Sequence, residues 1–353
     1  MYPRITVNTK KIRHNTGIVV KLCSRQGVSV AGVVKATCGM PEVAKAMLAG
    51  GATMLGDSRL ENLEKLAPFQ VPRLLLRLPM PSRAAEVVQH AEVSLNTETK
   101  TVKALGKAAL KQKKSHGVIL MLELGDLREG LPLDQLSRAV REVMSTGGIR
   151  LLGLGTNLTC YGGVLPDPDN LGVLTAAASR VQSEFGIMLD LISGGNSSSV
   201  HLLEKGLLPE GINHLRLGES ILLGRETAYG ETLEGAYGDT FALLAEVIEA
   251  REKPSLPQGK RGWDAFGKKP VFQDRGLRKK VILAVGRQDV HPENLTPLEP
   301  GVSVLGAGSD HLLLDVTEAK AQYQVGDTAA FRPNYAGLLQ LMTSPYVHKE
   351  LIK

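Results

Sequence analysis

The stretch SVAGVVK, at residues 29–35, is near-continuously apolar up to its last residue, Lys35. Seven further short apolar runs follow it, and segments of helical period separate them. The runs are at residues 52–56, 73–77, 91–96, 117–124, 149–156, 188–194 and 214–218. Apolar runs without alternation are typical of parallel strands that are buried on both faces. Eight β-then-α units predict an α/β fold, a (β/α)8 barrel, with an open doubly wound sheet as the alternative.

Helix signals fill the gaps between these runs. Pro41 can occupy a first helical position, and Gly50-Gly51 can end that helix. After the second run, Ser58 to Glu61 fit a capping box, in which the hydroxyl and the carboxylate satisfy free N–H groups.

The alternation of apolar runs and helical segments ends at about residue 235. The runs at 241–250, 279–290, 302–316 and 323–333 are separated by Gly/Pro-rich turns, with no convincing helix between most of them. This pattern predicts a smaller β-rich C-terminal domain. We therefore expect a barrel domain at 1–234 and a β-rich domain at 235–353.

The composition is that of an ordinary soluble globular protein, because 22% of the residues are charged and 43% are hydrophobic. No stretch predicts a membrane span or a signal peptide, and three cysteines cannot form a complete disulfide set, so a cytoplasmic location is expected. The net charge is +6, but residues 251–280 alone hold ten Lys/Arg against three Asp/Glu. The surplus is thus local, and no nucleic-acid partner is expected.

Lys35 is the strongest candidate for a catalytic residue. Catalytic groups in such barrels lie at the carboxyl ends of the strands. An amine behind Ala-Gly-Val-Val would be poorly hydrated there, which favours the neutral, nucleophilic form that a Schiff base requires. The alternative is a surface lysine just past the end of a strand.

The run Ser193 to Ser199, SGGNSSS, follows the seventh predicted strand. Glycines permit a close backbone turn, and N–H groups with serine hydroxyls can wrap a phosphate. Phosphate sites in barrels often form after strands seven and eight, where this run and Gly218 lie. An ordinary βα turn with Ser/Asn caps is the alternative.

Six motifs in order resemble the alanine racemase superfamily, the fold-type III pyridoxal-phosphate enzymes, and most of all its ornithine/lysine racemase branch. They are Gly32 to Gly39, Asp57 to Asn62, Leu124 to Gly130, Gly194 to Ser199, Leu215 to Glu219 and Gly308 to His311. The resemblance covers almost the whole chain, including the second domain.

The resemblance implies pyridoxal 5'-phosphate as cofactor, bound to Lys35 as a Schiff base, with Lys35 as one of two racemisation bases. Arg216 matches the arginine that faces the pyridine nitrogen, which limits electron withdrawal into the ring and so suppresses side reactions. Arg128 matches an arginine near the phenolic oxygen and the substrate carboxylate. The full expected cofactor-binding set is Lys35, Arg128, Asn157, Ser197, Ser198, Arg216, Gly218 and Glu219.

The sequence departs from alanine racemase at three positions. Gly39 replaces a tyrosine four residues after the lysine, and Asn157 replaces a histidine. Phe266 stands in the segment that corresponds to the second base, a tyrosine contributed by the other subunit, and it has no proton to transfer. Asp264, Asp310 and His311 are therefore the candidates for that base. The resemblance also implies a head-to-tail homodimer.

The expected function is racemisation of an amino acid, with ornithine or lysine favoured and no metal. Asp126 or Glu129 can bind a side-chain amine, or these acids can simply pair with Arg128. A decarboxylase of this fold type and a D-threonine-type aldolase are the alternatives; the first places a glutamate where Arg216 lies, and the second needs a metal. A non-catalytic cofactor-carrier protein is the alternative of another class, but such proteins resemble the barrel alone.

Overall fold

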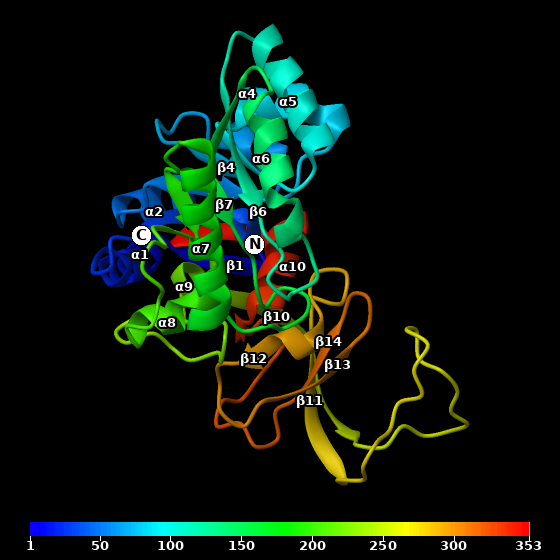
Figure 1. Ribbon diagram of the computed structural model, residues 1–353. Helices are drawn as coiled ribbons and strands as arrows, with labels where there is room; N and C mark the ends of the chain where they lie inside the picture. The colour runs from blue at the N-terminus through cyan, green and yellow to red at the C-terminus, as the bar shows by residue number, and fades with distance from the viewer. Residues whose placement is uncertain (353) are drawn as a thin grey trace. The chain divides into compact units, whose positions relative to one another are not determined.

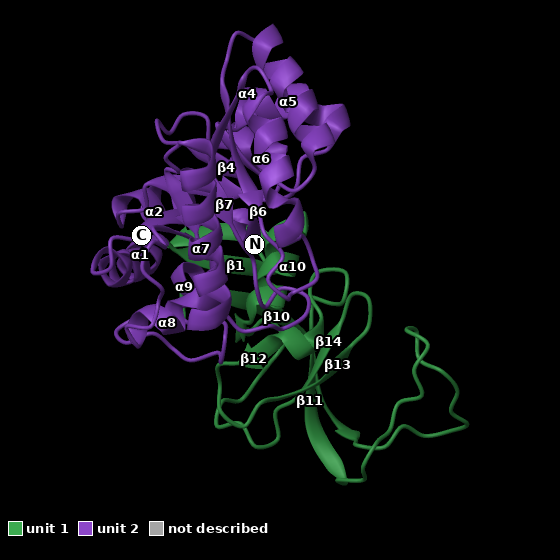
Figure 2. Ribbon diagram, in the orientation of Figure 1, with its two compact units in different colours: residues 1–8, 239–353 green, residues 9–238 purple. Residues whose placement is uncertain are grey.

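The computed structural model describes residues 1–352, which form two compact units. Unit 1 joins Met1–Asn8 to the chain from Asp239 onward, and unit 2 is Thr9–Gly238 (Figure 2). No helix within residues 1–352 is both long and apolar enough to cross a membrane.

Unit 2 is a closed barrel of eight parallel strands, which confirms the predicted (β/α)8 fold and rules out the open sheet. The strands are β2 (Ser29–Val33), β3 (Met54–Asp57), β4 (Arg73–Leu75), β5 (Val93–Asn96), β6 (His116–Met121), β7 (Ile149–Gly155), β8 (Leu191–Ser193) and β9 (His214–Leu217). Each lies within, or within one residue of, a predicted run. The barrel closes where β2 pairs with β9, with Ala31 opposite Arg216.

Helices connect the strands and carry their apolar residues on the face that is buried. They are α1 (Thr9–Ser24), α2 (Pro41–Ala49), α3 (Leu60–Lys65), α4 (Ala84–His90), α5 (Thr99–Lys111), α6 (Leu136–Met144), α7 (Pro168–Phe185), α8 (Val200–Glu204) and α9 (Glu219–Leu222) (Figure 1). In α5 the buried residues Val102, Leu105 and Ala109 recur at helical spacing. Pro41 begins α2 and Gly50 follows its end, as predicted.

The predicted capping box at Ser58 to Glu61 is wrong. The residue before α3 is Arg59, and no side chain caps it. Instead, Asp57 Oδ1 accepts hydrogen bonds from the Arg59 N–H at 2.9 Å and from Asn62 Nδ2 at 3.1 Å. The carboxylate at the end of β3 therefore holds the backbone just before α3 and one side chain of that helix.

The barrel interior is packed with apolar side chains from successive strands. One cluster includes Ala31, Leu74, Leu95, Ile119 and Met121, all at most 3% exposed. A filled interior of this kind leaves catalysis to the strand ends.

Unit 1 is a β-rich unit, as predicted for the C-terminal part of the chain. Its strands are β1 (Arg4–Asn8), β10 (Phe241–Pro254), β11 (Leu277–Leu283), β12 (Leu295–Pro297), β13 (Ser303–Ala307), β14 (Leu312–Asp315), β15 (Thr328–Pro333) and β16 (His348–Ile352). The path runs β12-β15-β10-β11-β14-β13, and β1 pairs with β10 and β16. The loop between β10 and β11 projects away from this sheet (Figure 1).

Two features of unit 1 differ from the expectation. Strand β1 belongs to its sheet, whereas the expected division at 234/235 put the N-terminus with the barrel. A helix, α10 (Tyr335–Thr343), follows β15, where the sequence analysis noted none.

Gly153 in β7 and Gly172 in α7 provide a matched test of the packing. A Cβ at Gly153 would lie 1.7 Å from the Leu191 carbonyl oxygen, whereas a Cβ at Gly172 would meet nothing within 4 Å. We expect Gly153→Ala to lower the free energy of unfolding by about 3 kcal/mol or more. Gly172→Ala should raise it by about 0.5–1 kcal/mol, because glycine is unfavourable inside a helix. Urea unfolding of both variants measures this, and equal effects would contradict the tight packing of β7 against β8.

Candidate active site

The barrel brings most of the residues predicted for cofactor binding to the carboxyl ends of its strands. Lys35 follows β2 and begins a single 3-10 turn, and Asn157 follows β7. Ser197 and Ser198 open the turn after β8, and Arg216 lies in β9 just before Gly218. Residues from four strands that are far apart in the sequence thus share one end of the barrel.

Arg216 is a buried charge, with 4% of its surface exposed. Its guanidinium donates to Ser193 Oγ, to the Thr156 carbonyl oxygen at 2.7 Å and to Asn157 Oδ1 at 3.5 Å. Burial lowers its pKa to about 10, which still leaves the group charged at neutral pH. Three acceptors therefore fix the orientation of this cation, one at the end of β8 and two directly after β7.

His214 extends this arrangement one layer deeper into the barrel. Its Nδ1 lies 2.8 Å from Ser193 Oγ, and burial lowers the pKa of the imidazole to about 3. The ring is therefore neutral at neutral pH. Since Ser193 Oγ accepts from Arg216, its own proton is available to His214 Nδ1, and Arg216, Ser193 and His214 form a chain of hydrogen bonds.

The Ser/Gly turn offers hydrogen-bond donors that have no partner within the protein. Ser198 is 1% exposed, and its Oγ has no hydrogen-bond partner. Ser197 Oγ accepts from the Ser220 N–H at 3.1 Å, and Asn157 Nδ2 is another buried atom without a partner. A Cβ at Gly218 would lie 3.2 Å from Val33 Cβ, so a side chain has little room there. Unpaired buried donors are costly, and this set fits a phosphate group.

The acidic residues around Arg128 are already engaged. Glu129 forms an ion pair with Arg128, and Asp126 accepts hydrogen bonds from the Tyr161 and Gly162 N–H groups. Glu219 accepts from Arg225 Nε at 2.8 Å. The alternative in which Glu129 simply pairs with Arg128 is therefore what the structure shows.

The structure gives a physical reason for Gly39. Its φ is +65°, and a Cβ there would lie 2.7 Å from Asn62 Cβ. Asn62 thus fills the space next to this backbone, and no tyrosine can stand at the position.

The three candidates for the second base lie in unit 1, and all are exposed. Asp264 Oδ1 accepts from the N–H groups of Phe266 and Lys268, and these backbone bonds, first of all that from Lys268, lower the pKa of its carboxyl. Asp310 accepts from Gln288 Nε2 at 2.6 Å and from Ser309 Oγ. The Asp264 and Asp310 segments both lie beside one further residue, Arg287.

Sequence reasoning missed Arg287 and Gln288. The Arg287 guanidinium lies 4.7 Å from the centre of the Phe266 ring, and the backbone N–H of Arg287 donates to the Gly308 carbonyl oxygen at 2.9 Å. Both residues stand just after β11, in a run noted only for its strand character. Only the folded sheet reveals that they join the two candidate segments.

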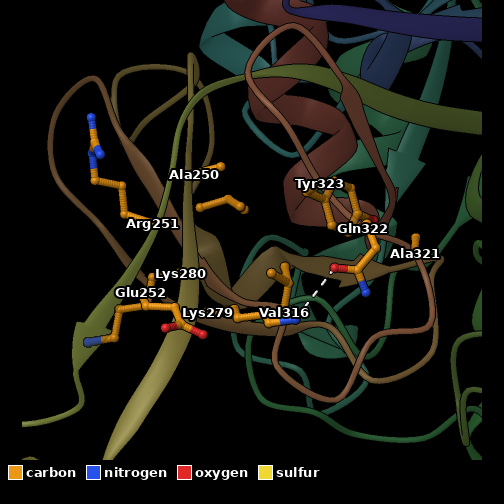
Figure 3. Close-up of a pocket in the computed structure, with 10 residues that line it drawn as sticks. Ala250, Arg251, Glu252, Lys279, Lys280, Val316, Ala321, Gln322 and Tyr323 are labelled. Atoms are coloured by element: carbon orange, nitrogen blue, oxygen red, sulfur yellow. Dashed lines mark hydrogen bonds between the residues drawn. The ribbon is translucent and has the colours of Figure 1, made fainter.

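A surface hollow of about 220 Å³ in unit 1 is lined by Arg251, Lys279 and Tyr323, among others (Figure 3). Lys279 Nζ donates to Gln322 Oε1 at its edge. None of the predicted site residues lines it. Within residues 1–352, no group of three or more His, Cys, Asp or Glu side chains is arranged to hold a metal ion.

Comparison with known proteins gives a consistent result. Residues 7–226 match the family described as alanine racemase, N-terminal domain. The chain is 45% identical over 353 residues to the ornithine racemase of Acetoanaerobium sticklandii, covering 100% of both chains. It is 40% identical over 351 residues to the lysine racemase of Thermotoga maritima, covering 99% of this chain and 98% of that protein. Its fold is similar to that of the alanine racemase of E. faecalis, with a TM-score of 0.74 at 18% identity over 99% of this chain and 98% of that one.

The neutral, buried His214 predicts a component of acid sensitivity. Its pKa is about 3 in the fold, against an ordinary value of 6.5. Between these values the unfolded chain binds one more proton than the folded protein, so the free energy of unfolding falls as the pH falls from 6.5 towards 3. His214→Gln should reduce the slope of the unfolding free energy against pH, by the equivalent of up to one bound proton. Urea unfolding between pH 4 and 7 measures it, with exposed His348→Gln as the control; an unchanged slope in His214→Gln would contradict the assignment.

Proposed function

The chain belongs to the alanine racemase family, and from that premise we propose that it is a pyridoxal-phosphate-dependent racemase of a basic amino acid, ornithine or lysine. The observation that carries the chemistry is the register of the barrel. Ala31 lies opposite Arg216, so Lys35 and Arg216 belong to the same end of two adjacent strands. The choice of substrate rests on the two full-length racemase relatives.

Different residues at the strand ends would bind different parts of the cofactor. The free hydroxyl of Ser198, together with Ser197 and Gly218, would bind the phosphate. Asn157 Nδ2 is a further donor without a partner, and Glu219 would act indirectly by fixing Arg225. Arg128 would lie near the phenolic oxygen and the substrate carboxylate. When bound, the cofactor withdraws electrons from the amino acid and makes its Cα proton acidic.

Lys35 would hold the cofactor and move the proton on one face of the Cα. Arg216 would face the pyridine nitrogen with a permanent positive charge, which its three acceptors keep in place. A nitrogen facing this cation stays unprotonated, so electron withdrawal into the ring is limited and side reactions such as decarboxylation are suppressed.

The other face of the Cα needs a second proton carrier. We propose that it comes from unit 1 of the partner subunit in a homodimer, and that Asp310 or His311 supplies it. Asp264 is less suited, because its carboxylate holds two backbone N–H groups and its pKa is lowered. The cysteines Cys23, Cys38 and Cys160 form no disulfide bond within residues 1–352, which fits the reducing cytoplasm, where we propose that the protein acts.

The purified protein should racemise L-ornithine or L-lysine faster than L-arginine, L-alanine or L-serine. Loss of optical rotation measures this, with carbon dioxide and aldehyde followed in parallel. Lys35→Ala should lose both the activity and the visible absorbance of the lysine-bound cofactor. Carbon dioxide as the main product would indicate a decarboxylase, aldehyde from D-threonine an aldolase, and no turnover with any amino acid a carrier.

A shared active site can be tested by mixing two inactive variants. Lys35→Ala loses one base, and the double variant Asp310→Asn, His311→Asn loses both candidates for the other. If a site combines Lys35 of one subunit with unit 1 of its partner, dissociating and reassociating the mixture should restore about a quarter of the wild-type activity, because half the dimers are mixed and each holds one intact site. Neither variant should be active alone. A double variant with full activity would overturn the role of Asp310 and His311.

A further inference from the structure

Asp57 is a buried carboxyl group with one oxygen satisfied and one not. It is the last residue of β3 and is 0% exposed. Its Oδ1 accepts from the Arg59 N–H at 2.9 Å and from Asn62 Nδ2 at 3.1 Å. Its Oδ2 is buried and has no hydrogen-bond partner. A buried acceptor in this state is costly, and such atoms call for an explanation.

Lys35 follows the strand next to that of Asp57. Strands β2 and β3 are neighbours, with Val33 opposite Gly56, and the Val34 N–H donates to the Gly56 carbonyl oxygen at 2.9 Å. The residues that follow these pairs are Lys35 and Asp57. The charge of Lys35 also acts on the Asp57 carboxyl, where it favours the ionised form.

Other cations around this strand end are bound elsewhere or exposed. Lys65 Nζ, on α3, donates to the Cys38 carbonyl oxygen and to Asn62 Oδ1, and the Arg59 side chain is exposed. Arg77 follows β4, on the other side of β3. Arg216, beside β2 on β9, has its own three acceptors.

We propose that Asp57 is a positioning residue for Lys35. Whenever the Lys35 amine is charged and not bound to the cofactor, the unpaired Oδ2 of Asp57 accepts a hydrogen bond from it. The proposal rests on the proposed function in one respect, namely that the amine of Lys35 is released and protonated during turnover. An ammonium group in a poorly hydrated strand end needs a counter-charge, and a buried carboxylate needs the same. Each charge therefore offsets the desolvation cost of the other.

Burial and the neighbouring groups act in opposite directions on the pKa of the Asp57 carboxyl. Burial raises the pKa of Asp57 above its usual value, and the hydrogen bonds from Arg59 and Asn62 and the charge of Lys35 oppose that effect. A carboxyl in this position ionises most readily when the neighbouring amine is charged. The charged amine of Lys35 therefore favours the ionised form of Asp57.

Competitive acetylation of the cofactor-free, full-length protein tests the pairing without any catalytic assay. Asp57→Asn keeps the acceptor for Arg59 and Asn62 and removes only the charge. Because the uncharged amine alone reacts with acetic anhydride, losing the counter-charge should raise the acetylation of Lys35 at pH 7 about tenfold and move its pH profile to lower pH. Exposed Lys45, read from the same digests by mass spectrometry, serves as the internal reference.

Asp190→Asn is the matched control, because Asp190 is an exposed carboxylate of the same unit that pairs with Arg150. It removes one charge far from the strand end and should leave the labelling of Lys35 unchanged. Equal labelling of Lys35 in the wild type and in Asp57→Asn would overturn the proposal, as would an equal rise in Asp190→Asn.

A reciprocal variant covers the case in which Asp57→Asn does not fold. Carbon-13 NMR of the Asp57 carboxyl should show its pKa raised further in cofactor-free Lys35→Ala than in the wild type, because the cation that opposes burial is gone. An unmoved titration would refute the pairing. The failure of every amino acid to racemise would instead refute the proposed function, while both of these measurements would still report on Asp57 and Lys35.

Discussion

The hydrogen-bonded ladder between β2 and β9 is the constraint on which the candidate site depends. These are the first and last strands of the barrel, and their pairing closes the sheet with Ala31 opposite Arg216. In an open sheet they would lie at opposite edges, and Lys35 would have no arginine beside it. Since β3 is the other neighbour of β2, Lys35 follows a strand that lies between the strand of a buried cation and the strand of a buried carboxyl.

The polar groups inside the barrel unit differ in how completely they are satisfied. Arg216 is bound by acceptors from Ser193, Thr156 and Asn157, and so its charge can be buried. Nearer the strand ends, four buried atoms have no partner: Ser198 Oγ, Asn157 Nδ2, Asp57 Oδ2 and Asn96 Oδ1. Folded proteins rarely leave buried polar atoms unpaired, and four at one end of a barrel indicate groups kept for a ligand or for a side chain that moves.

The sequence predicted the barrel because its apolar runs are continuous and evenly spaced, which depends on local pattern alone. It did not predict that β1 joins the sheet of unit 1, because that pairing links residues more than two hundred positions apart. The same limit applies to the site. Lys35, Arg216 and the Ser/Gly turn carry recognisable local signals. The partnership of Ser193 with His214 arises from strand register, and the place of Arg287 beside Phe266 arises from a contact between two loops. The capping error at Ser58 is local, because Asp57, one residue earlier, accepts from the Arg59 N–H and from Asn62 Nδ2.

Gly39, Asn62 and Asp57 form a single coupled arrangement at the mouth of the barrel. Asn62 occupies the space in which a side chain at position 39 would lie, and its amide also donates to Asp57 Oδ1. Lys65 in turn bridges Asn62 Oδ1 and the Cys38 carbonyl oxygen, so the start of α3 is tied to the turn that carries Lys35. Glycine at position 39 therefore depends on Asn62, which fills the adjacent space and donates to a buried carboxyl. The remaining oxygen of that carboxyl lies at the end of β3, the strand next to the one that Lys35 follows.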